Sequence, residues 1–422
     1  MHRFIAALVA AASCAQVAHA QTATSPPRAT TEPTFTLQRA LALAGAASPS
    51  LLAGAAGVQA ATAGRALAAL RPNPEIEATT EYFGGGGAYR GLSSAENTVR
   101  LAVPIELGGK RSARVAVAEA QIDRAQIGAA LGIADLTLVI TQGYIDAAAA
   151  ERRLTVARDQ ARIAAEAFRA ARTRVTAGAA SPIEQQRADV LRINADTAVE
   201  RTARTAEVAR SNLARLIGRP VTGAFDAAWF DRIGGYGSAR TITADGTLAL
   251  AAATADARTA TAQVRLAQAQ RIPNVTVSAG VRRLDATGDI VGVAGIGIPL
   301  PIFNNGKAAV DQARALQTQA EAQRQIALIE ANRSIASAQA EIANTAATAR
   351  AAGGPALLAA TEAARIARIG YVGGEFGQLD LLEAERTLAQ TRAEAIDALA
   401  AYHDAEARLA RLTAPAPMLD GR

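Results

Sequence analysis

The sequence contains few of the residues on which enzymes and ordinary globular cores depend. Aromatic residues make up 4% of the 422 residues, and the chain has one cysteine, Cys14, and three histidines. Globular cores usually bury aromatic and large aliphatic side chains, so a set of ordinary domains is not expected. Only His403 lies beyond residue 20. A chain that loses its N-terminus therefore has no cysteine for a disulfide, a thiol nucleophile or a metal ligand.

Motifs for catalysis and ligand binding are also lacking. The sequence contains no nucleophile elbow, no P-loop and no metal-binding motif. The glycine run from Gly84 to Gly87 has no helix pattern after it, so it does not form a phosphate cradle. We therefore expect no enzymatic activity, no cofactor and no resident metal site.

Lysine is nearly absent, which bears on the class of partner. It occurs only at Lys110 and Lys307, and arginine supplies the rest of the 44 basic residues, interleaved with 38 acidic ones. Interleaved charges are typical of ion-paired helix surfaces, so nucleic acid is not an expected partner. Beyond the N-terminus, no stretch of about 18 apolar residues is free of charge, which excludes a polytopic helical membrane protein.

Alanine is abundant instead, and it favours helices more than any other residue. The chain is 50% hydrophobic, which argues against disorder, and its 34 glycines show no three-residue period, which excludes collagen. The composition therefore predicts long helices that pack closely against one another.

The N-terminus has the features of an export signal. A positive charge at Arg3, an apolar run over residues 4–14 and the small-x-small pattern at residues 18–20 predict a signal peptide over residues 1–20. A weak lipobox at residues 11–14 gives an alternative, in which Cys14 is lipidated and becomes the mature N-terminus. The sequence leaves both cleavage sites open.

The rest of the chain reads as a tandem repeat of about 200 residues. Four short segments recur in the same order at offsets of 195 to 201 residues. One match would be weak, but four ordered matches at nearly one offset are hard to obtain by chance. The pairs are Pro72-Asn73 with Pro273-Asn274, residues 103–107 with 298–302, Gly109-Lys110 with Gly306-Lys307, and residues 177–184 with 373–380.

Each repeat is predicted to contain a helix, two strands and a long helical hairpin. Alternation with period two gives the strands one apolar face and one polar or small face. The helices that follow are about 90 Å long at about 60 residues, so they require coiled-coil packing. Gly353-Gly354-Pro355 should interrupt or kink the second of them. The expected helices span residues 37–70, 113–175, 182–217, 244–270, 308–369 and 378–412, and the strands span 75–82, 98–107, 275–282 and 290–302.

These elements give an expected division of the whole chain. Residues 1–20 are the signal peptide, 21–35 a flexible segment, 218–240 a collar between the repeats, and 414–422 a C-terminal tail. The first repeat spans 36–217, with its strand pair at 74–107 and its hairpin at 110–217; the second spans 241–413, with its strand pair at 274–302 and its hairpin at 307–412.

Four strands with an apolar face cannot span a membrane alone, because every backbone group in a bilayer must be paired. The expected strands are about 10 to 12 residues long, which suffices to cross when tilted, and the smallest usual barrel has about eight strands. We therefore expect several chains to close one barrel: two copies give eight strands and three give twelve. A soluble β-domain on a coiled-coil stalk remains the alternative.

Several local runs carry a family resemblance. They are Phe35-Thr36-Leu37, Arg71-Pro72-Asn73-Pro74-Glu75 and residues 107–114, Leu-Gly-Gly-Lys-Arg-Ser-Ala-Arg. Together with the export signal and the repeated strand pair and hairpin, they make residues 37–412 resemble the TolC-type outer membrane efflux proteins. Residues 107–114 resemble the heavy-metal branch, the outer component of cobalt–zinc–cadmium-type systems. Ser48 before Pro49 departs from the family, which more often has asparagine there.

The resemblance implies a mainly α fold with a small β part. It implies a homotrimer with a twelve-stranded barrel in the outer membrane lipid, continuous with a helical barrel in the periplasm. It also implies a periplasmic adaptor and an inner-membrane pump of the RND type as partners. The chain would then be a passive exit duct for metal cations, or alternatively for drugs or other solutes.

The resemblance also assigns roles to the two turns of the long hairpins. In the family these turns form the periplasmic tip, where the tunnel closes and the adaptor docks. The docking candidates in this sequence are Gly178, Ser181, Gly373, Gly374 and Gly377.

A gate is expected beside the second turn. Asp380 and Glu383 match the family's two acids, lie three residues apart on one helix face and would form stacked acidic rings in a trimer. The simpler alternative is two solvated acids near a helix N-terminus, where acids are favoured anyway. Glu184 is the repeat counterpart of Asp380.

Two further residues concern how the tip is held closed. Tyr371 matches the tyrosine that ties the closed tip in the family, whereas Phe376 stands where the family has an arginine. Apolar contact through Phe376 would have to replace the lock that this arginine supplies.

A protein of another class, a periplasmic coiled-coil structural or adaptor protein, is the second hypothesis. An adaptor would carry one hairpin within a compact β-rich domain. Two equivalent hairpins and two strand pairs favour the duct.

Overall fold

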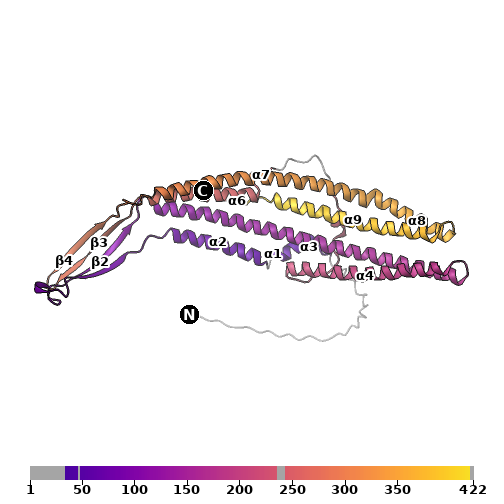
Figure 1. Ribbon diagram of the computed structural model, residues 1–422, viewed down its shortest axis with the longest axis horizontal. Helices are drawn as coiled ribbons and strands as arrows, with labels where there is room; N and C mark the ends of the chain where they lie inside the picture. Colours follow the sequence, from indigo (N-terminus) through magenta and orange to yellow (C-terminus); the bar gives the residue numbers. More distant parts are fainter. Residues whose placement is uncertain (1–33, 46–47, 235–242, 419–422) are drawn as a thin grey trace, which may run out of the picture.

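The computed structural model describes residues 34–45, 48–234 and 243–418. The expected signal peptide and Cys14 lie outside the described residues. The molecule is elongated, with a four-stranded sheet at one end and long helices that run from it to two hairpin turns at the other end (Figure 1). This mainly α fold with a small sheet confirms the predicted fold class.

The sheet is antiparallel throughout, and its strand order is β1-β2-β3-β4. The central pair, β2 and β3, joins the two repeats, so the halves of the chain share one sheet. In the described chain, β1 and β4 are the sheet's edges. The strands are β1 Glu75–Glu81, β2 Glu96–Ile105, β3 Val275–Leu284 and β4 Ile290–Gly297.

The register gives the sheet one apolar face and one polar face, because directly paired residues point to the same side. One row across the sheet is Ile76, Leu101, Ala279 and Ala294. Ile76 is 79% exposed and Ile296, on the same face, is 73% exposed, so this face is uncovered in the single chain. An uncovered apolar face on a sheet with open edges fits lipid contact only if further copies complete the sheet.

The opposite face carries charges in paired rows. Arg100 donates two hydrogen bonds to Glu77, at 2.7 and 2.9 Å. Arg282 bridges Glu81, at 3.0 Å, and Glu96, at 2.5 Å. These cross-strand ion pairs place acids and arginines together on the face that would line a closed barrel.

Beyond the sheet, helices of very different length run alongside one another. Helix α3 has 67 residues, which corresponds to about 100 Å. By length and composition it could cross a membrane, but it packs along α2 and α6 near the sheet and along α4 and α9 further away. The helices are α1 Leu37–Gly45, α2 Pro49–Ala68, α3 Lys110–Thr176, α4 Pro182–Ile217, α5 Ala227–Phe230, α6 Leu248–Gln270, α7 Lys307–Ala351, α8 Leu357–Gly373 and α9 Gln378–Leu412.

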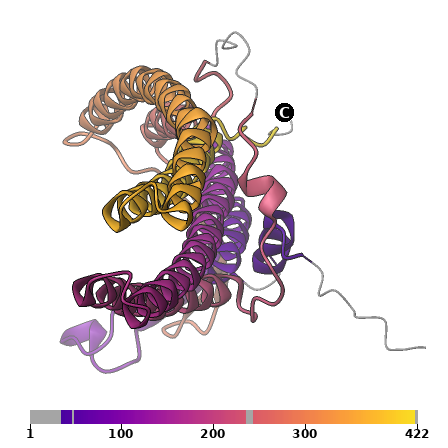
Figure 2. The same cartoon turned by 90° about the vertical axis from the view of Figure 1, so that its right-hand side faces the viewer.

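Seen along the long axis, these helices form a curved wall, with α1 and the short α5 lying against one side of α3 (Figure 2). A curved, one-layer wall cannot enclose a core by itself. This shape agrees with alanine-rich seams between helices that contact one another along their length.

The interruption expected at residues 353–355 is present between α7 and α8. Residues Ala352–Ala356 form a π-helical segment, and Gly354 has φ −102° and ψ −107° inside it. Pro355 lacks the N–H that a regular helix would use at this point.

Two expected elements differ from the structure. The single helix predicted over residues 37–70 is two helices, α1 and α2, because Pro49 starts a new helix after Ser48. The last strand was expected to reach residue 302 but ends at Gly297. Pro299 and Pro301 follow, and proline cannot donate a ladder hydrogen bond.

Several aromatic side chains gather where the collar meets the long helices. The Tyr144 hydroxyl donates to the Phe35 carbonyl at 2.8 Å and accepts from the Asp226 N–H at 3.1 Å. Burial raises the pKa of Tyr144. Phe225 and Trp229 meet the Tyr144 ring edge-on, at 5.1 and 5.2 Å. The collar is therefore anchored on α3 by a compact aromatic cluster.

Candidate functional site

The two turns of the long hairpins lie side by side at the end of the molecule opposite the sheet (Figure 1). Each turn begins at a glycine in the left-handed region, Gly178 with φ 72° and Gly374 with φ 78°. A side chain is disfavoured at these angles, so glycine lets both helices end sharply. The tip is thus built from two short turns on rigid helices.

Asp380 and Glu383 are both exposed; Asp380 lies in the first turn of α9 and Glu383 about one turn further along the helix. The Asp380 carboxylate accepts a hydrogen bond from the Gly377 N–H at 2.9 Å. Asp380 therefore caps α9, which agrees with the alternative that these acids favour a helix N-terminus, and the hydrogen bond fixes the direction of its carboxylate. The role of Asp380 and Glu383 as a gate stays a prediction.

Tyr371 is buried at 7% exposure, and Arg174 from the other hairpin stacks over its ring at 5.1 Å from the centroid. This cation–π contact links the last turn of α3 to the last turn of α8. The sequence did not indicate Arg174, because nothing in its local pattern shows that residues 174 and 371 meet. An arginine therefore does reach the tip tyrosine, but from the first repeat.

Phe376 contacts its own hairpin. Its ring lies so close to Gly370 that a Cβ at Gly370 would sit 2.1 Å from ring carbon Cδ2, and its N–H donates to the Gly370 carbonyl at 3.1 Å. Phe376 is still 41% exposed. Phe376 thus closes the turn between α8 and α9, and its contact with Gly370 lies within one hairpin.

The two hairpins are also joined by Gln378, which no local sequence pattern indicates. Its side-chain N–H donates to the backbone carbonyl of Glu184 at 3.0 Å. The Glu184 Oε2 and Gln378 Oε1 atoms are buried without a hydrogen-bonding partner in the described chain. Glu184 therefore lies at the contact between the hairpins and not simply on an open face.

Helices α8 and α9 are held together just behind the tip. Arg368 donates two hydrogen bonds to the buried carboxylate of Glu385, one of them 2.9 Å long. The hydrogen bond to Glu385 raises the pKa of Arg368. Removing either partner of a buried ion pair lowers stability, because the other charge is left buried without a partner. This pair therefore holds α8 and α9 together.

The docking candidates all lie at the surface of the tip. The hydroxyl of Ser181 accepts from the Ile183 N–H at 3.4 Å and caps α4. Val372, beside them, is 87% exposed. The candidates are Gly178, Ser181, Gly373, Gly374 and Gly377, each exposed.

No metal centre accompanies these residues. Within residues 34–45, 48–234 and 243–418, no group of three or more His, Cys, Asp or Glu side chains could hold a metal ion. His403 is buried in α9, stacks on Trp229 at 4.3 Å and donates from Nε2 to the Phe230 carbonyl at 2.9 Å. This histidine therefore binds the collar.

Comparison with known proteins now identifies the family. The outer membrane efflux protein family matches residues 40–219 and 244–414, which cover both repeats. The chain belongs to the outer membrane efflux protein family. Members of this family form trimers and function with adaptor and pump partners, and the chain is an outer membrane efflux channel with its helical part in the periplasm.

Relatives and solved structures of this family span most of the chain. The cobalt-zinc-cadmium resistance protein CzcC of Cupriavidus metallidurans is 29% identical over 385 residues, 90% of each chain. The nickel and cobalt resistance protein CnrC of the same organism is 32% identical and covers 73% of this chain and 72% of its own. The solved structure of CusC has the same fold, with a TM-score of 0.76 at 16% identity over 89% of this chain and 91% of CusC.

These efflux relatives confirm the resemblance seen in residues 107–114 and decide between the two protein classes. A channel of the outer membrane efflux protein family is supported, and a periplasmic structural or adaptor protein is not. The relatives are efflux proteins and not enzymes.

Proposed function

We propose that this channel is the exit duct for heavy-metal cations in a tripartite efflux system. It conducts passively from a periplasmic adaptor and an inner-membrane pump of the RND type to the exterior. The observation that carries the proposal is the 29% identity to CzcC over 90% of both chains. CnrC supports it with 32% identity over 73% of this chain. Both relatives are metal-resistance proteins by name.

The charges of the sheet support cations as cargo. On its polar face lie Glu75, Glu77, Glu81 and Glu96 against Arg100 and Arg282. Acids outnumber arginines on this face, and Arg282 is shared by two of them. A wall with excess negative charge attracts cations and repels anions at close quarters.

The gate assignment belongs to the same proposal. Asp380 and Glu383 are exposed at the tip and would form two stacked acidic rings in a trimer. Tyr371, with Arg174 over its ring, and Phe376 would hold the closed tip, and Glu184 would lie at the seam between hairpins. The exposed glycines of the two turns, with Val372 next to Gly373, would receive the adaptor.

The test is a deletion of the gene in its own host, with growth measured against cobalt, zinc, cadmium and nickel. We expect tolerance to at least one of these metals to fall and the wild-type gene to restore it. Growth against drugs is measured in parallel. Unchanged metal tolerance together with lowered drug tolerance would assign the duct to drug efflux instead.

A further inference from the structure

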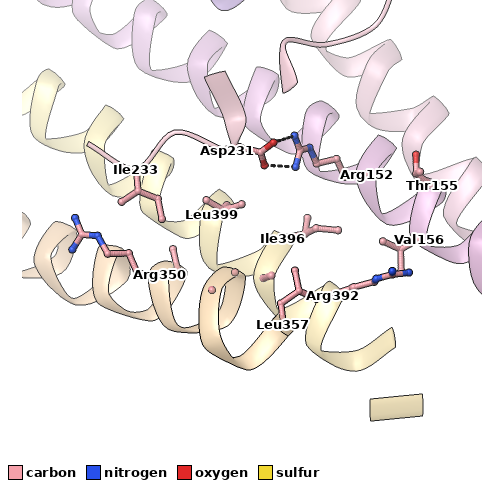
Figure 3. A pocket seen from close by; sticks show the side chains of 14 residues that line it. Arg152, Thr155, Val156, Asp231, Ile233, Arg350, Leu357, Arg392, Ile396 and Leu399 are labelled. Atoms are coloured by element: carbon pink, nitrogen blue, oxygen red, sulfur yellow. Dashed lines mark hydrogen bonds and ion pairs between the residues drawn. The ribbon is translucent and has the colours of Figure 1, made fainter. Parts of the chain in front are cut away.

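The central strands of the sheet have both of their neighbours within one chain, unlike the helical wall. A groove of about 700 Å³ lies on that wall beside the collar (Figure 3). In it Arg152 is paired with Asp231, and Arg350 and Arg392 point apart at its two ends. One copy leaves the wall incomplete, whereas the surroundings of side chains on β2 and β3 are already complete in the single chain.

The apolar face of the sheet, which faces lipid in a closed barrel and is called the outward face below, becomes polar at one row. This row lies four residues along each strand from the row that contains Ile76, so it is on the same face. Among the outward positions of the four described strands, Arg283 is the one charged residue. The row consists of Thr80, Asn97, Arg283 and Ile290.

The polar row lies at the end of the sheet that points away from the helices, next to the β1–β2 loop and the β3–β4 turn (Figure 1). Because the helical part is in the periplasm, this end faces the outside of the cell. From Leu107, just after β2, back to Asn97 is ten residues, with an exposed apolar side chain at every second position over 99–107.

Ten residues of strand are about 33 Å long, which gives about 25 Å of height at a tilt of about 40°. The apolar band of an outer membrane barrel has about this height. The row with Arg283 therefore lies at the outer boundary of the lipid. A charge on the lipid-facing surface is least costly at this depth and most costly at the midplane.

Arg283 is held by a hydrogen-bonded network that crosses three strands. Asp285, just after β3, accepts from Arg283 Nε and from the side-chain N–H of Asn97, both at 3.0 Å. Asn97 in turn accepts from the Thr80 hydroxyl at 2.8 Å. The backbone N–H of Asp285 donates to the Ala95 carbonyl at 2.9 Å. Asp285 is thus fixed in place, and it fixes the guanidinium of Arg283.

This network leaves the terminal amino groups of Arg283 available. Within the described ranges of the chain, its guanidinium donates through Nε only, and the side chain is 66% exposed. Each carboxylate oxygen of Asp285 already accepts a hydrogen bond, and that side chain is only 26% exposed. Arg283 therefore offers two amino groups at the depth of the lipid headgroups.

We propose that this row binds phosphate headgroups of the outer-leaflet lipid, with both terminal amino groups of Arg283 donating to the phosphate oxygens. The planar N–H donors of a guanidinium match a phosphate. The phosphate belongs to a lipid because the row continues the lipid-facing surface without a break. A trimer carries three such contacts, and they are independent of the cargo of the channel.

The test places a tryptophan at Ile290, which pairs directly with Arg283 and is 71% exposed. The trimer of Ile290→Trp is reconstituted in phosphatidylcholine vesicles that contain either dibrominated phosphatidic acid, a phosphate monoester, or dibrominated phosphatidylcholine. Trp229, the chain's natural tryptophan, lies in the collar and gives an unquenched baseline. We expect both lipids to quench the introduced tryptophan and phosphatidic acid to bind at least about threefold more tightly.

Variants in the Ile290→Trp background assign the preference to one side chain. Arg283→Gln should remove the preference for phosphatidic acid, and Arg283→Lys should keep part of it, since lysine retains the charge without the planar donors. Arg386→Gln, which removes an exposed arginine on α9, is the matched control and should keep the whole preference. Migration as a trimer on unheated gels checks that each variant is assembled.

Four results would overturn the proposal. If neither lipid quenches the introduced tryptophan, the row lies outside the membrane. Equal affinity for the two lipids in the protein that retains Arg283 shows that phosphate is not recognised, and this result needs no further variant. An unchanged preference in Arg283→Gln places recognition elsewhere.

The fourth result concerns the source of the phosphate. Excess inorganic phosphate, added at constant ionic strength, should leave the preference unchanged, and loss of the preference would mean that the row binds a free anion. Metal tolerance of the same variants reports on the proposed function separately, so failure of one proposal leaves the other standing.

Discussion

Some tip residues can be identified from the sequence, whereas the roles of others appear only in the structure. Tyr371, Asp380 and Glu383 could be named because each matches a tip position of the resembled family, and Asp380 and Glu383 also lie three residues apart. Arg174 and Gln378 could not, because their roles depend on contacts with residues 371 and 184, almost 200 positions away. The local sequence of neither hairpin indicates which residues of the other hairpin it contacts.

The cap on α9 gives Asp380 two roles that a substitution can separate. Its carboxylate accepts from the Gly377 N–H, and asparagine can accept the same bond through its amide oxygen. Asp380→Asn thus removes the charge while it keeps the cap. Glu383→Gln removes the second charge without a known structural cost, since Glu383 is exposed.

We therefore expect the double variant Asp380→Asn, Glu383→Gln to stay folded and to lose cation preference. The ratio of cation to anion permeability, from reversal potentials in planar bilayers, should fall at least about twofold, and block by trivalent cations should weaken. Glu207→Gln, which neutralises an exposed acid on α4, is the control and should leave both quantities unchanged. Unaltered selectivity and block in the double variant would remove the gate assignment.

At the scale of elements, the sequence predicts strand positions from hydrophobic periodicity and helix breaks from glycine and proline. Alternation with period two located all four strands, and Gly353-Gly354-Pro355 located the break between α7 and α8. Pro49, Pro299 and Pro301 stand within hydrophobic patterns that predict longer elements. Proline has no N–H for a helix or ladder hydrogen bond, so the elements end there although the hydrophobic pattern continues.

The collar was harder to predict, because its contacts are made by few residues of irregular chain. His403 and Glu406 on α9 lie beside it, with His403 Nδ1 3.2 Å from Glu406 Oε2. Tyr402 donates to the other oxygen of Glu406 at 2.6 Å and accepts from the Gly234 N–H at 2.9 Å. Burial disfavours the ionised form of Glu406, but the hydrogen bonds from His403 and Tyr402 outweigh it and hold the pKa below its ordinary value of 4.5.

This lowered pKa predicts how collar stability depends on pH. A carboxyl group with a lowered pKa in the folded state contributes stability above its unfolded pKa, and the contribution is lost as the pH falls through the folded value. The thermal midpoint, followed by circular dichroism, should therefore drop below about pH 4.5 in the wild type. Glu406→Gln should be less stable at pH 7 and should show a smaller drop, whereas Glu341→Gln, an exposed acid on α7, should follow the wild type. Identical pH profiles for Glu406→Gln and the wild type would contradict this assignment.

The whole molecule is incomplete as a single chain. Its sheet exposes an apolar face and two open edges, and its helices form only a curved wall. Both features were predictable from the repeat, because four strands cannot close a barrel. The number of copies was not, since two and three copies satisfy the same rule. Family membership decides for three.

Closure of the barrel requires β1 of one copy to pair with β4 of the next, and the lack of cysteine beyond Cys14 makes this testable. Within one chain, β2 and β3 separate β1 from β4 by about 14 Å, which is beyond the reach of a disulfide. Ala78→Cys on β1 combined in turn with cysteine at Ile290, Ala294 or Ile296 on β4, which lie on the same face of the sheet, should therefore cross-link only between copies. At least one pair should give covalent trimers on a non-reducing gel. Cysteines at Ala78 and Val99, which pair directly within one chain, should give monomers only. If no β1–β4 pair yields covalent dimers or trimers, the edges do not meet and the sheet is completed in another way.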